Sequence, residues 1–467
     1  MLAVVVLVAC SDKAAPRTAA GSSASSAAPA GAVGAEGVGD AYFPDLGNGG
    51  YDVDHYDLTL AVDPKTNQVD ATAVISATAP QPLRQFDLDL SGLDVTAVKV
   101  DDGAATFTRH DRELVITPAH PTGATFTVSV AYHGSPEPRT TKALPIAVGW
   151  IATGDGSYVL SEPEGASTWY PVNDHPSDKA SYTFHVTVPT GVTAVANGDL
   201  VSSTPTADGH TTFTFDEKAP MASYLAQLAI GDYRVTTEAG PNGVTIRNVF
   251  ASQLETDPTA HFSRTPEMLQ VFAGDFGPFP FDIYGALVVN DRTQFALETQ
   301  TLSLFDPSYV DGPTAGDEAV AHELAHQWFG DSVTPSSWKD IWLNEGFATY
   351  AEWLWHEHTD GVPVALTAQR THDSLQPSGV LTGDPGVGHL FDVGAVYQRG
   401  ALTLEALRLT VGDDAFFTTL RTYAARFAGK SVATADFIAV ANEVAHRDLH
   451  DFFDQWLYRA PLPGLPS

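Results

Sequence analysis

The spacing of apolar side chains along this chain changes near residue 240, and this change limits the folds that are open to it. Before that point apolar and polar residues alternate in short runs, the pattern of strands with one buried face. The run at 55–63 places Tyr56, Leu58, Leu60 and Val62 on one face. Similar runs, separated by turn residues, occur at 69–79, 86–90, 113–117, 125–132 and 181–188. We therefore expect a largely antiparallel β domain over residues 42–240.

Beyond residue 240 the spacing shifts towards the 3.6-residue period of helices. It predicts helices at 315–329, 338–358, 396–410, 413–427, 436–446 and 451–457. Gly330 and Gly412 stand where helix C-caps are favoured. Residues 281–290 still alternate, so a strand is expected there. The predicted fold class is multidomain, a β domain followed by an α+β domain over residues 241–467.

Charge and cysteine content exclude several classes of protein. The chain has 467 residues, with 24 Lys and Arg against 57 Asp and Glu, which gives a formal net charge of −33. A surface this acidic repels phosphate, so we expect no nucleic-acid partner. The single cysteine, Cys10, excludes an intrachain disulfide framework and a cysteine-based zinc cluster.

Cys10 ends a short apolar run at the start of the chain. Residues 1–10 are too few to span a bilayer and predict a lipoprotein-type signal segment. The run ends in Leu7-Val8-Ala9-Cys10, which resembles a bacterial lipobox, although no Lys or Arg precedes it. Residues 11–41, rich in Ala, Ser, Gly and Pro, predict a disordered tether. We expect an extracytoplasmic protein, secreted or held at the membrane only by a lipid anchor at Cys10. The alternative is a buried apolar strand with a chance cysteine.

The most specific motif lies inside the predicted helix at 315–329. It reads His322-Glu323-Leu324-Ala325-His326. Four residues advance a helix by about 6 Å and about 400°, so both imidazoles leave the same face and can hold one metal ion. Glu323 lies between them and can reach a metal-activated water. The composition makes a chance occurrence of this pattern a minor alternative.

A third ligand candidate, Glu345, follows His326 after eighteen intervening residues, on the next predicted helix. Two histidines and one glutamate leave a coordination position open, as catalytic rather than structural zinc sites do. We therefore expect one Zn²⁺ per chain. It would make water acidic and polarise a carbonyl, while Glu323 accepts the proton.

These residues resemble the aminopeptidase N family of zinc metallopeptidases, the gluzincins related to leukotriene hydrolase. The segment around the third ligand reads Trp342-Leu343-Asn344-Glu345-Gly346-Phe347-Ala348, and segments 169–176 and 276–281 also fit. The resemblance runs from about residue 42 to the C-terminus. It implies an N-terminal antiparallel β saddle or sandwich domain followed by a thermolysin-like zinc peptidase domain. It also implies a short form without the large C-terminal helical domain of many members, and hence a more open cleft.

The resemblance implies further site residues. Tyr397 takes the place of a family tyrosine that stabilises the oxyanion of the tetrahedral intermediate. Glu298 matches the glutamate that binds the substrate's α-amine, although its neighbours Phe295, Leu297 and Thr299 depart from the family segment. For a second amine-binding acid from the β domain, Glu164 is the best match and Glu162 is the alternative.

Glu352 lies about two helical turns beyond Glu345. It is expected to accept a hydrogen bond from a liganding imidazole, as outer-shell carboxylates do. An exposed position for Glu352 on the solvent face of the helix is an equally good interpretation.

The predicted function is a zinc-dependent aminopeptidase that removes the N-terminal residue from peptides with a free N-terminus, through a zinc-activated water with a glutamate general base. Two alternatives stay open, a zinc endopeptidase of the same fold and an inactive peptidase-like binding lipoprotein. The presence of Glu164 and Glu298 argues against the first alternative, although the altered segment around Glu298 keeps it open. Glu323 and Tyr397 argue against the second. The preferred first residue and the oligomeric state are left open.

Overall fold

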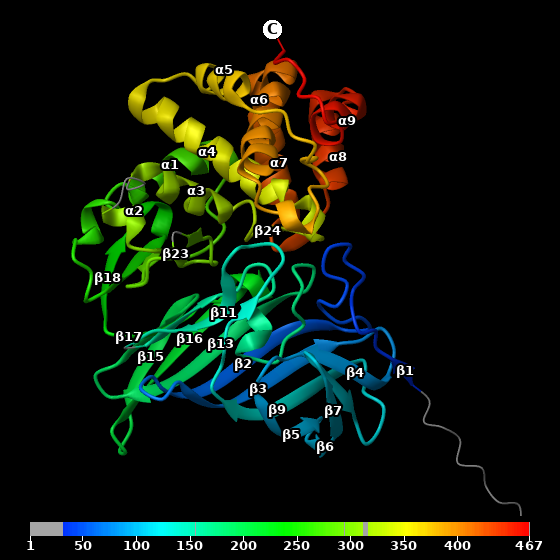
Figure 1. Ribbon diagram of the computed structural model, residues 1–467, viewed down its shortest axis with the longest axis vertical. Coiled ribbons are helices and arrows are strands. Elements are labelled where there is room, and N and C mark those ends of the chain that lie inside the picture. The colour runs from blue at the N-terminus through cyan, green and yellow to red at the C-terminus, as the bar shows by residue number, and fades with distance from the viewer. Residues whose placement is uncertain (1–30, 155, 294, 312–315, 467) are drawn as a thin grey trace, which may run out of the picture.

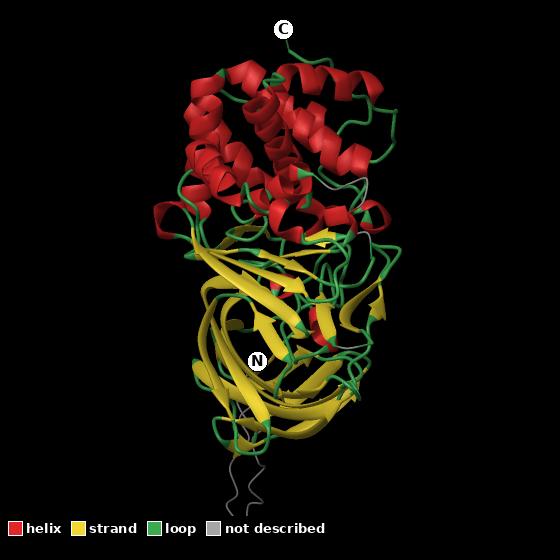
Figure 2. Cartoon of the chain, turned by 90° about the vertical axis from the view of Figure 1, so that its left-hand side faces the viewer, coloured by secondary structure: helices red, strands yellow, loops and turns green. Residues whose placement is uncertain are grey.

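The structure is a computed structural model that describes residues 31–154, 156–293, 295–311 and 316–466. Strands fill one half of the molecule and most helices the other, as Figures 1 and 2 show. The predicted signal segment, Cys10 and most of the predicted tether lie outside the described residues. No helix within the described ranges is long and apolar enough to cross a membrane.

The largest sheet of the β domain has eight strands and is antiparallel except for the β13–β2 pair, which is parallel. Its order is β15 (Asp199–Pro205), β16 (His210–Ala222), β13 (Lys179–Pro189), β2 (Asp52–Asp63), β3 (Gln68–Thr78), β9 (Thr125–Gly134), β5 (Asp94–Val100) and β6 (Gly103–Ala104). The alternation predicted for β2 is present, because Tyr56, Leu58, Leu60 and Val62 are all buried. The largely antiparallel β domain predicted from the sequence is therefore confirmed.

Two smaller sheets complete this domain. The first has four strands, in the order β1 (Ala32–Val33), β4 (Leu83–Asp89), β8 (Glu113–Thr117) and β7 (Thr106–His110). The second has five, in the order β10 (Arg139–Thr140), β11 (Ala147–Ala152), β12 (Ser157–Leu160), β17 (Leu228–Gly231) and β14 (Thr193–Ala196). The turn that follows β12 carries Glu162 and Glu164, the two acids considered for the substrate's amine.

The second domain begins earlier than predicted. Its mixed sheet runs β18 (Tyr233–Ala239), β19 (Thr245–Ala251), β21 (Ala286–Val288), β23 (Ser303–Phe305) and β22 (Ala296–Leu297), with β20 (Ile283–Tyr284) beside β19. The predicted boundary at 240/241 cuts the β18–β19 hairpin, because a change of period cannot tell to which sheet a strand belongs. The boundary is corrected to the short connection between Gly231 and Tyr233.

Helices form most of the rest of this domain. They are α1 (Thr265–Phe276), α2 (Ser308–Asp311), α3 (Asp317–His326), α4 (Trp342–Asp360), α5 (Val364–Ser374), α6 (Arg399–Val411), α7 (Asp413–Phe427), α8 (Thr434–Ala445) and α9 (His450–Leu457). A short sheet pairs β24 (Val333–Pro335) with β25 (Lys430–Val432). The six predicted helices are present, with ends that shift by a few residues. Helices α1, α2 and α5 were not predicted. Helix α5 buries only Val364 and Ala368, too few for a clear apolar stripe.

The end of the predicted tether is ordered, which corrects that prediction for residues 31–41. Strand β1 pairs with β4, and the buried Asp40 lies where the two domains meet. Its Oδ2 accepts hydrogen bonds from Ser337 Oγ at 2.7 Å and from the Trp338 backbone N–H at 3.1 Å. Its Oδ1 accepts from the Tyr42 N–H at 2.8 Å. A low content of large apolar residues therefore did not prevent ordering, because strand pairing and the hydrogen bonds of one buried carboxylate supply the contacts.

Replacing Asp40 by Asn is expected to lower the free energy of unfolding by about 2–3 kcal/mol, because an amide group would then face buried donors. Burial would raise the pKa of Asp40, but hydrogen bonds from His175, Ser337 and the backbone hold it below its usual value. A carboxylate with a depressed folded-state pKa stabilises the protein above its unfolded pKa of about 3.9 and loses that contribution as the pH falls. Urea denaturation of wild type should therefore show a decline below about pH 4 that is shallower in Asp40→Asn.

The control is Asp45→Asn, since Asp45 is exposed on the same segment. Its stability should stay within about 0.5 kcal/mol of wild type. Equal stabilities of the two variants would show that Asp40 does not hold the domains together.

Candidate active site

Helix α3 carries the two predicted histidine ligands on one face. The acids Asp317 and Glu318 in its first turn suit the positive end of the helix dipole. The rings of His322 and His326 lie one turn apart, with their centroids separated by 4.7 Å. The helical spacing read from the sequence therefore brings both imidazoles to one point.

Helix α4 brings Glu345 to the same point. Its Oε2 lies 3.3 Å from His322 Nε2 and 3.5 Å from His326 Nε2. Next to it, Gly346 allows α4 to approach α6, because a Cβ there would lie 2.9 Å from the Cα of Gly400. Two ring nitrogens and one carboxylate oxygen thus converge within 4.8 Å of one another, from two packed helices.

The other nitrogen of each ring is already occupied. His322 Nδ1 lies 2.6 Å from Glu352 Oε1, and His326 Nδ1 lies 3.1 Å from the carbonyl oxygen of Phe329. Both partners accept hydrogen bonds, so each Nδ1 is the donor, and in the neutral ring each Nε2 keeps a free lone pair. This is the tautomer that a metal needs, and Glu352 has the outer position that the sequence suggested.

Four glutamates share this site, and each residue is at most 6% exposed. They are Glu162, Glu298, Glu323 and Glu345. Among the described residues, Oε1 of Glu162, Oε1 of Glu298 and Oε2 of Glu323 have no hydrogen-bond partner. Burial raises the pKa of Glu162 and of Glu298 above the usual range. It would also raise that of Glu345, but His326 and His322 lower it to about 2. Buried carboxyl oxygens without a hydrogen-bond partner fit a divalent cation, whose charge would favour their ionised form, and the His, His, Glu donor set fits zinc.

Glu323 lies on the inner side of α3, between the two ligands. One of its oxygens lies within 4.8 Å of ligand atoms of both His326 and Glu298. Burial raises the pKa of Glu323 to about 8, against the opposing effect of His322 and His326. It lines the cavity beside the metal ligands, where the positive charge of a bound zinc ion would favour the carboxylate form that accepts a proton from water.

Tyr397 reaches the site from a π-helical turn at Val393–Gln398, just before α6. Its ring stacks on His322, with centroids 5.9 Å apart and planes 12° from parallel. Burial raises the pKa of the Tyr397 hydroxyl well above its usual value, and Glu345 adds to the effect. The phenol therefore stays protonated at neutral pH and can donate a hydrogen bond to developing negative charge.

The structure brings Glu298 to the metal ligands but does not bring Glu164 there. An oxygen of Glu162 lies within 4.8 Å of oxygens of Glu298 and Glu345. Glu164 instead pairs with Arg112 at 2.9 Å and Arg139 at 3.2 Å. We therefore correct the second acid from Glu164 to Glu162. The sequence showed two acids in one turn, and their spacing alone could not decide which of them faces the metal ligands.

Apolar side chains form the rest of the cavity wall. The lining residues that are neither acids nor histidines are Leu144, Leu160, Phe295, Ala296, Leu297, Phe391 and Tyr397. Leu144, Leu160 and Phe391 carry no sequence signal for this site, because they come from loops and strand ends far apart along the chain. No Lys or Arg is among the described residues that line this cavity.

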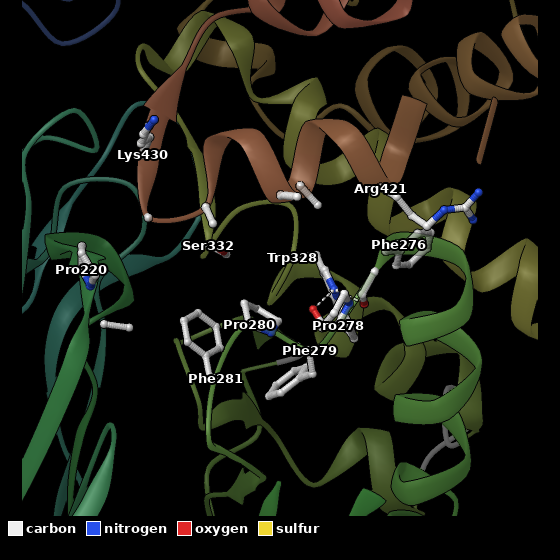
Figure 3. A pocket seen from close by; sticks show the side chains of 16 residues that line it. Pro220, Phe276, Pro278, Phe279, Pro280, Phe281, Trp328, Ser332, Arg421 and Lys430 are labelled. Atoms are coloured by element: carbon white, nitrogen blue, oxygen red, sulfur yellow. Dashed lines mark hydrogen bonds between the residues drawn. The ribbon is translucent and has the colours of Figure 1, made fainter. Parts of the chain in front are cut away.

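A larger cavity, of about 570 Å³, lies elsewhere in the molecule (Figure 3). Its walls come mainly from the segment 276–281, which includes Pro278, Phe279 and Pro280, and from α7. The described residues that line it include no acid and no histidine, so they offer no cluster of side chains that could hold a metal ion. The chemistry therefore belongs to the smaller, acidic site.

Comparison with known proteins places this geometry in a family. A model of the peptidase family M1 domain matches residues 261–456, and one of the peptidase M1 N-terminal domain matches residues 52–225. The crystal structure of an M1 zinc metallopeptidase from Deinococcus radiodurans is 35% identical, with a TM-score of 0.85 over 92% of this chain and 99% of that chain. The chain belongs to the M1 family of zinc metallopeptidases. The family, the two-domain fold and the zinc cofactor predicted from the sequence are thereby confirmed.

Curated M1 relatives are longer than this chain. Probable aminopeptidase 1 of Sulfurisphaera tokodaii is 24% identical over 82% of this chain and 50% of its own length. Aminopeptidase N of Streptomyces lividans is 30% identical over 62% of this chain and 36% of its own length. The chain thus spans half or less of these relatives. A second solved structure, of a two-domain M1 zinc metallopeptidase, is covered over its full length, with a TM-score of 0.86 and 35% identity.

Proposed function

We propose that this protein is a zinc-dependent aminopeptidase that acts on peptides with a free N-terminus. The observation that carries the proposal is the meeting of Glu162 and Glu298 beside Glu345. Two carboxylates at that place can hold a cationic α-amine through charge-assisted hydrogen bonds. A substrate held there by its amine presents its first peptide carbonyl to the metal, and no other.

The roles of the protein's own groups follow from their positions. His322, His326 and Glu345 would hold zinc, which would supply the Lewis acidity needed to polarise the carbonyl and to make water acidic. Glu323 accepts the proton from the attacking water and can return it to the leaving amine. Tyr397 donates its hydroxyl hydrogen to the negative charge that develops on the carbonyl oxygen.

The names of several relatives, and the ligands in several solved structures, support this proposal. The curated relatives include aminopeptidases N and glutamyl aminopeptidases. A variant of the Deinococcus radiodurans enzyme has been solved bound to the substrate Tyr-Ser-Ala. Variants described as two-domain M1 zinc metallopeptidases have been solved with L-tryptophan and with L-arginine. Ligands of this kind all carry a free α-amine.

Removal of the amine-binding acids should weaken the preference for a free N-terminus. Hydrogen bonds to a charged group contribute about 1.5–3 kcal/mol, so Glu298→Ala or Glu162→Ala should reduce the ratio of kcat/KM on free and acetylated peptides by about 10–100-fold. The measurement uses a leucyl peptide and its N-acetylated form, with mass spectrometry to locate the cut.

Glu164→Ala is the matched control, because Glu164 is two residues from Glu162 but pairs with Arg112 and Arg139. It should leave that ratio unchanged. Internal cleavage of the acetylated peptide by wild type at a comparable rate would favour the endopeptidase alternative. A zinc-loaded protein that cleaves neither peptide would favour the inactive binding lipoprotein.

We further propose that the protein is exported and held at the membrane by a lipid on Cys10. The support is the sequence alone, the apolar run that ends in Leu7-Val8-Ala9-Cys10 and the small, polar residues after it. Cys10→Ser should move the protein from the membrane fraction to the medium or to an unprocessed precursor. Ser11→Ala, which keeps the thiol, should fractionate as wild type does. Unchanged fractionation of Cys10→Ser would contradict the anchor.

A further inference from the structure

We infer that Gln327 is a positioning residue, which sets the distance between the metal-binding helix and the turn that carries Glu298. The inference rests on the proposed function, because it assigns Glu298 to the substrate's amine. It concerns the backbone of residues 298–301, which is held on one side by Gln327 and on the other by the β domain.

Gln327 directly follows the ligand His326 and is fully buried. Its Nε2 donates a hydrogen bond to the carbonyl oxygen of Glu298 at 3.0 Å. Its Oε1 accepts one from the backbone N–H of Thr301 at 2.8 Å. One side chain thus binds both ends of the turn, and its own Cα is one residue from a metal ligand. The side-chain amide of Gln327 therefore ties the backbone of Glu298 directly to the metal-binding helix.

The backbone of Thr301 shows that the turn is held under constraint. Its φ is +65°, in the left-handed region, where a β-branched residue is a rare outlier. Such a conformation persists only where its surroundings over-determine it, and these outliers cluster at functional sites. While the Thr301 N–H donates to Gln327, the Thr301 hydroxyl accepts a hydrogen bond from the Gly198 N–H at 2.8 Å and donates one to Glu217 Oε2 at 3.1 Å.

The β domain holds the same turn through the loop at Asn197 and Gly198. Asn197 Nδ2 donates to the carbonyl oxygen of Gln300 at 2.6 Å, and its Oδ1 accepts from the Gln227 N–H. Gly198 has a φ of +74°, and a Cβ there would lie 2.2 Å from the Asp216 carbonyl oxygen, so the close approach requires glycine.

These contacts align acids that come from two domains. Glu162 follows a strand of the β domain, whereas Glu298 belongs to the second domain. The turn at 298–301 forms hydrogen bonds to both domains. It is bonded to the β domain through Asn197 and to the second domain through Gln327. A misplacement of about 1 Å far from the reacting atoms can cost about 10²-fold in rate. Loss of the Gln327 bonds should therefore impair amine binding without touching the metal ligands.

The test is Gln327→Met, which keeps the length of the side chain and removes both its donor and its acceptor. We expect unchanged zinc content, a raised KM for free leucyl peptide and a fall of kcat/KM by about 10²-fold. The ratio of kcat/KM on free and acetylated peptide should fall with it. If Gln327 had only a structural role, its replacement would lower kcat/KM on the free and the acetylated peptide by the same factor and leave their ratio unchanged.

Gln227→Met is the matched control. Gln227 is also fully buried, and its side-chain amide has no hydrogen-bond partner among the described residues. Its replacement should leave the ratio as in wild type. A Gln327→Met ratio equal to that of this control, or a loss of zinc that accounts for the whole effect, would overturn the inference.

A second variant keeps the test decisive if Gln327→Met fails to fold. Thr301→Val removes the hydroxyl but keeps the branched shape, so it should shift the same ratio in the same direction, whereas Thr301→Ser should restore it. An unchanged ratio in Thr301→Val would contradict the role of the turn.

Calorimetry separates this inference from the proposed function. The dissociation constant of L-leucine should rise about tenfold in Gln327→Met and stay unchanged in Gln227→Met, whichever peptide bond the enzyme cuts. If wild type does not distinguish free from acetylated peptides, the proposed function is wrong, and the leucine measurement alone decides the role of Gln327. Equal dissociation constants in wild type and Gln327→Met would then overturn it.

Discussion

Glu323→Gln is expected to lower kcat by about 10²–10⁴-fold while the protein keeps its zinc. Gln has nearly the shape of Glu, and the three ligands His322, His326 and Glu345 are untouched. The amide cannot accept a proton at neutral pH, so the attacking water loses its base. Because Glu323 lines the cavity but supplies none of these ligand atoms, KM should change little. Steady-state kinetics and metal analysis of the purified variant measure the two quantities separately.

The matched control is Glu318→Gln on the same helix, since Glu318 is exposed in the first turn of α3. It should leave kcat near that of wild type. A Glu323→Gln variant that retains more than about a tenth of the wild-type kcat would show that another group takes the proton. Loss of zinc from this variant would instead indicate that Glu323 helps to hold the metal.

Tyr397→Phe is expected to lower kcat by about 10²–10³-fold, the usual loss for one oxyanion donor. The ring remains, so its stacking on His322 at 5.9 Å should persist and the zinc content should not change. Because the hydroxyl serves charge that exists only in the transition state, kcat and kcat/KM should fall together.

Tyr423→Phe is the matched control for this variant. Tyr423 is a buried tyrosine of α7 whose hydroxyl has no hydrogen-bond partner among the described residues. It should retain wild-type kinetics. Near-normal kcat in Tyr397→Phe would mean that a different donor faces the carbonyl oxygen, and a raised KM with normal kcat would assign the hydroxyl to ground-state binding.

The parts of this structure that could be predicted from the sequence are those that depend on local periodicity. The alternating run of β2 and the helical run of α7 each bury one face, so the spacing of their apolar residues is sufficient. Likewise His322 and His326 share a helix, so the geometry of the pair is contained in their spacing. Glu345 could be added from its spacing of eighteen residues after His326, and in the structure its helix packs directly on theirs.

The parts that could not be predicted depend on contacts between distant segments. Glu162 and Glu164 are two residues apart in one turn, and their roles are separated by Arg112 and Arg139, which come from other parts of the β domain. Asp40 is buried because Ser337 and Trp338, almost 300 residues later, donate hydrogen bonds to it. No local pattern contains such information, and the family resemblance alone ordered the two acids wrongly.

The π-helical turn that carries Tyr397 makes the position of its hydroxyl depend on the length of the chain before α6. A π-helical turn bonds residue i to i+5 and holds one residue more than the α-helix around it. Each residue of an α-helix turns the next by about 100°. Deletion of a single residue between Val393 and Val396 would let the turn relax into α6 and swing the phenol out of the site, with no ligand altered. For anyone who shortens or grafts this loop, its residue count therefore matters as much as the identity of its side chains.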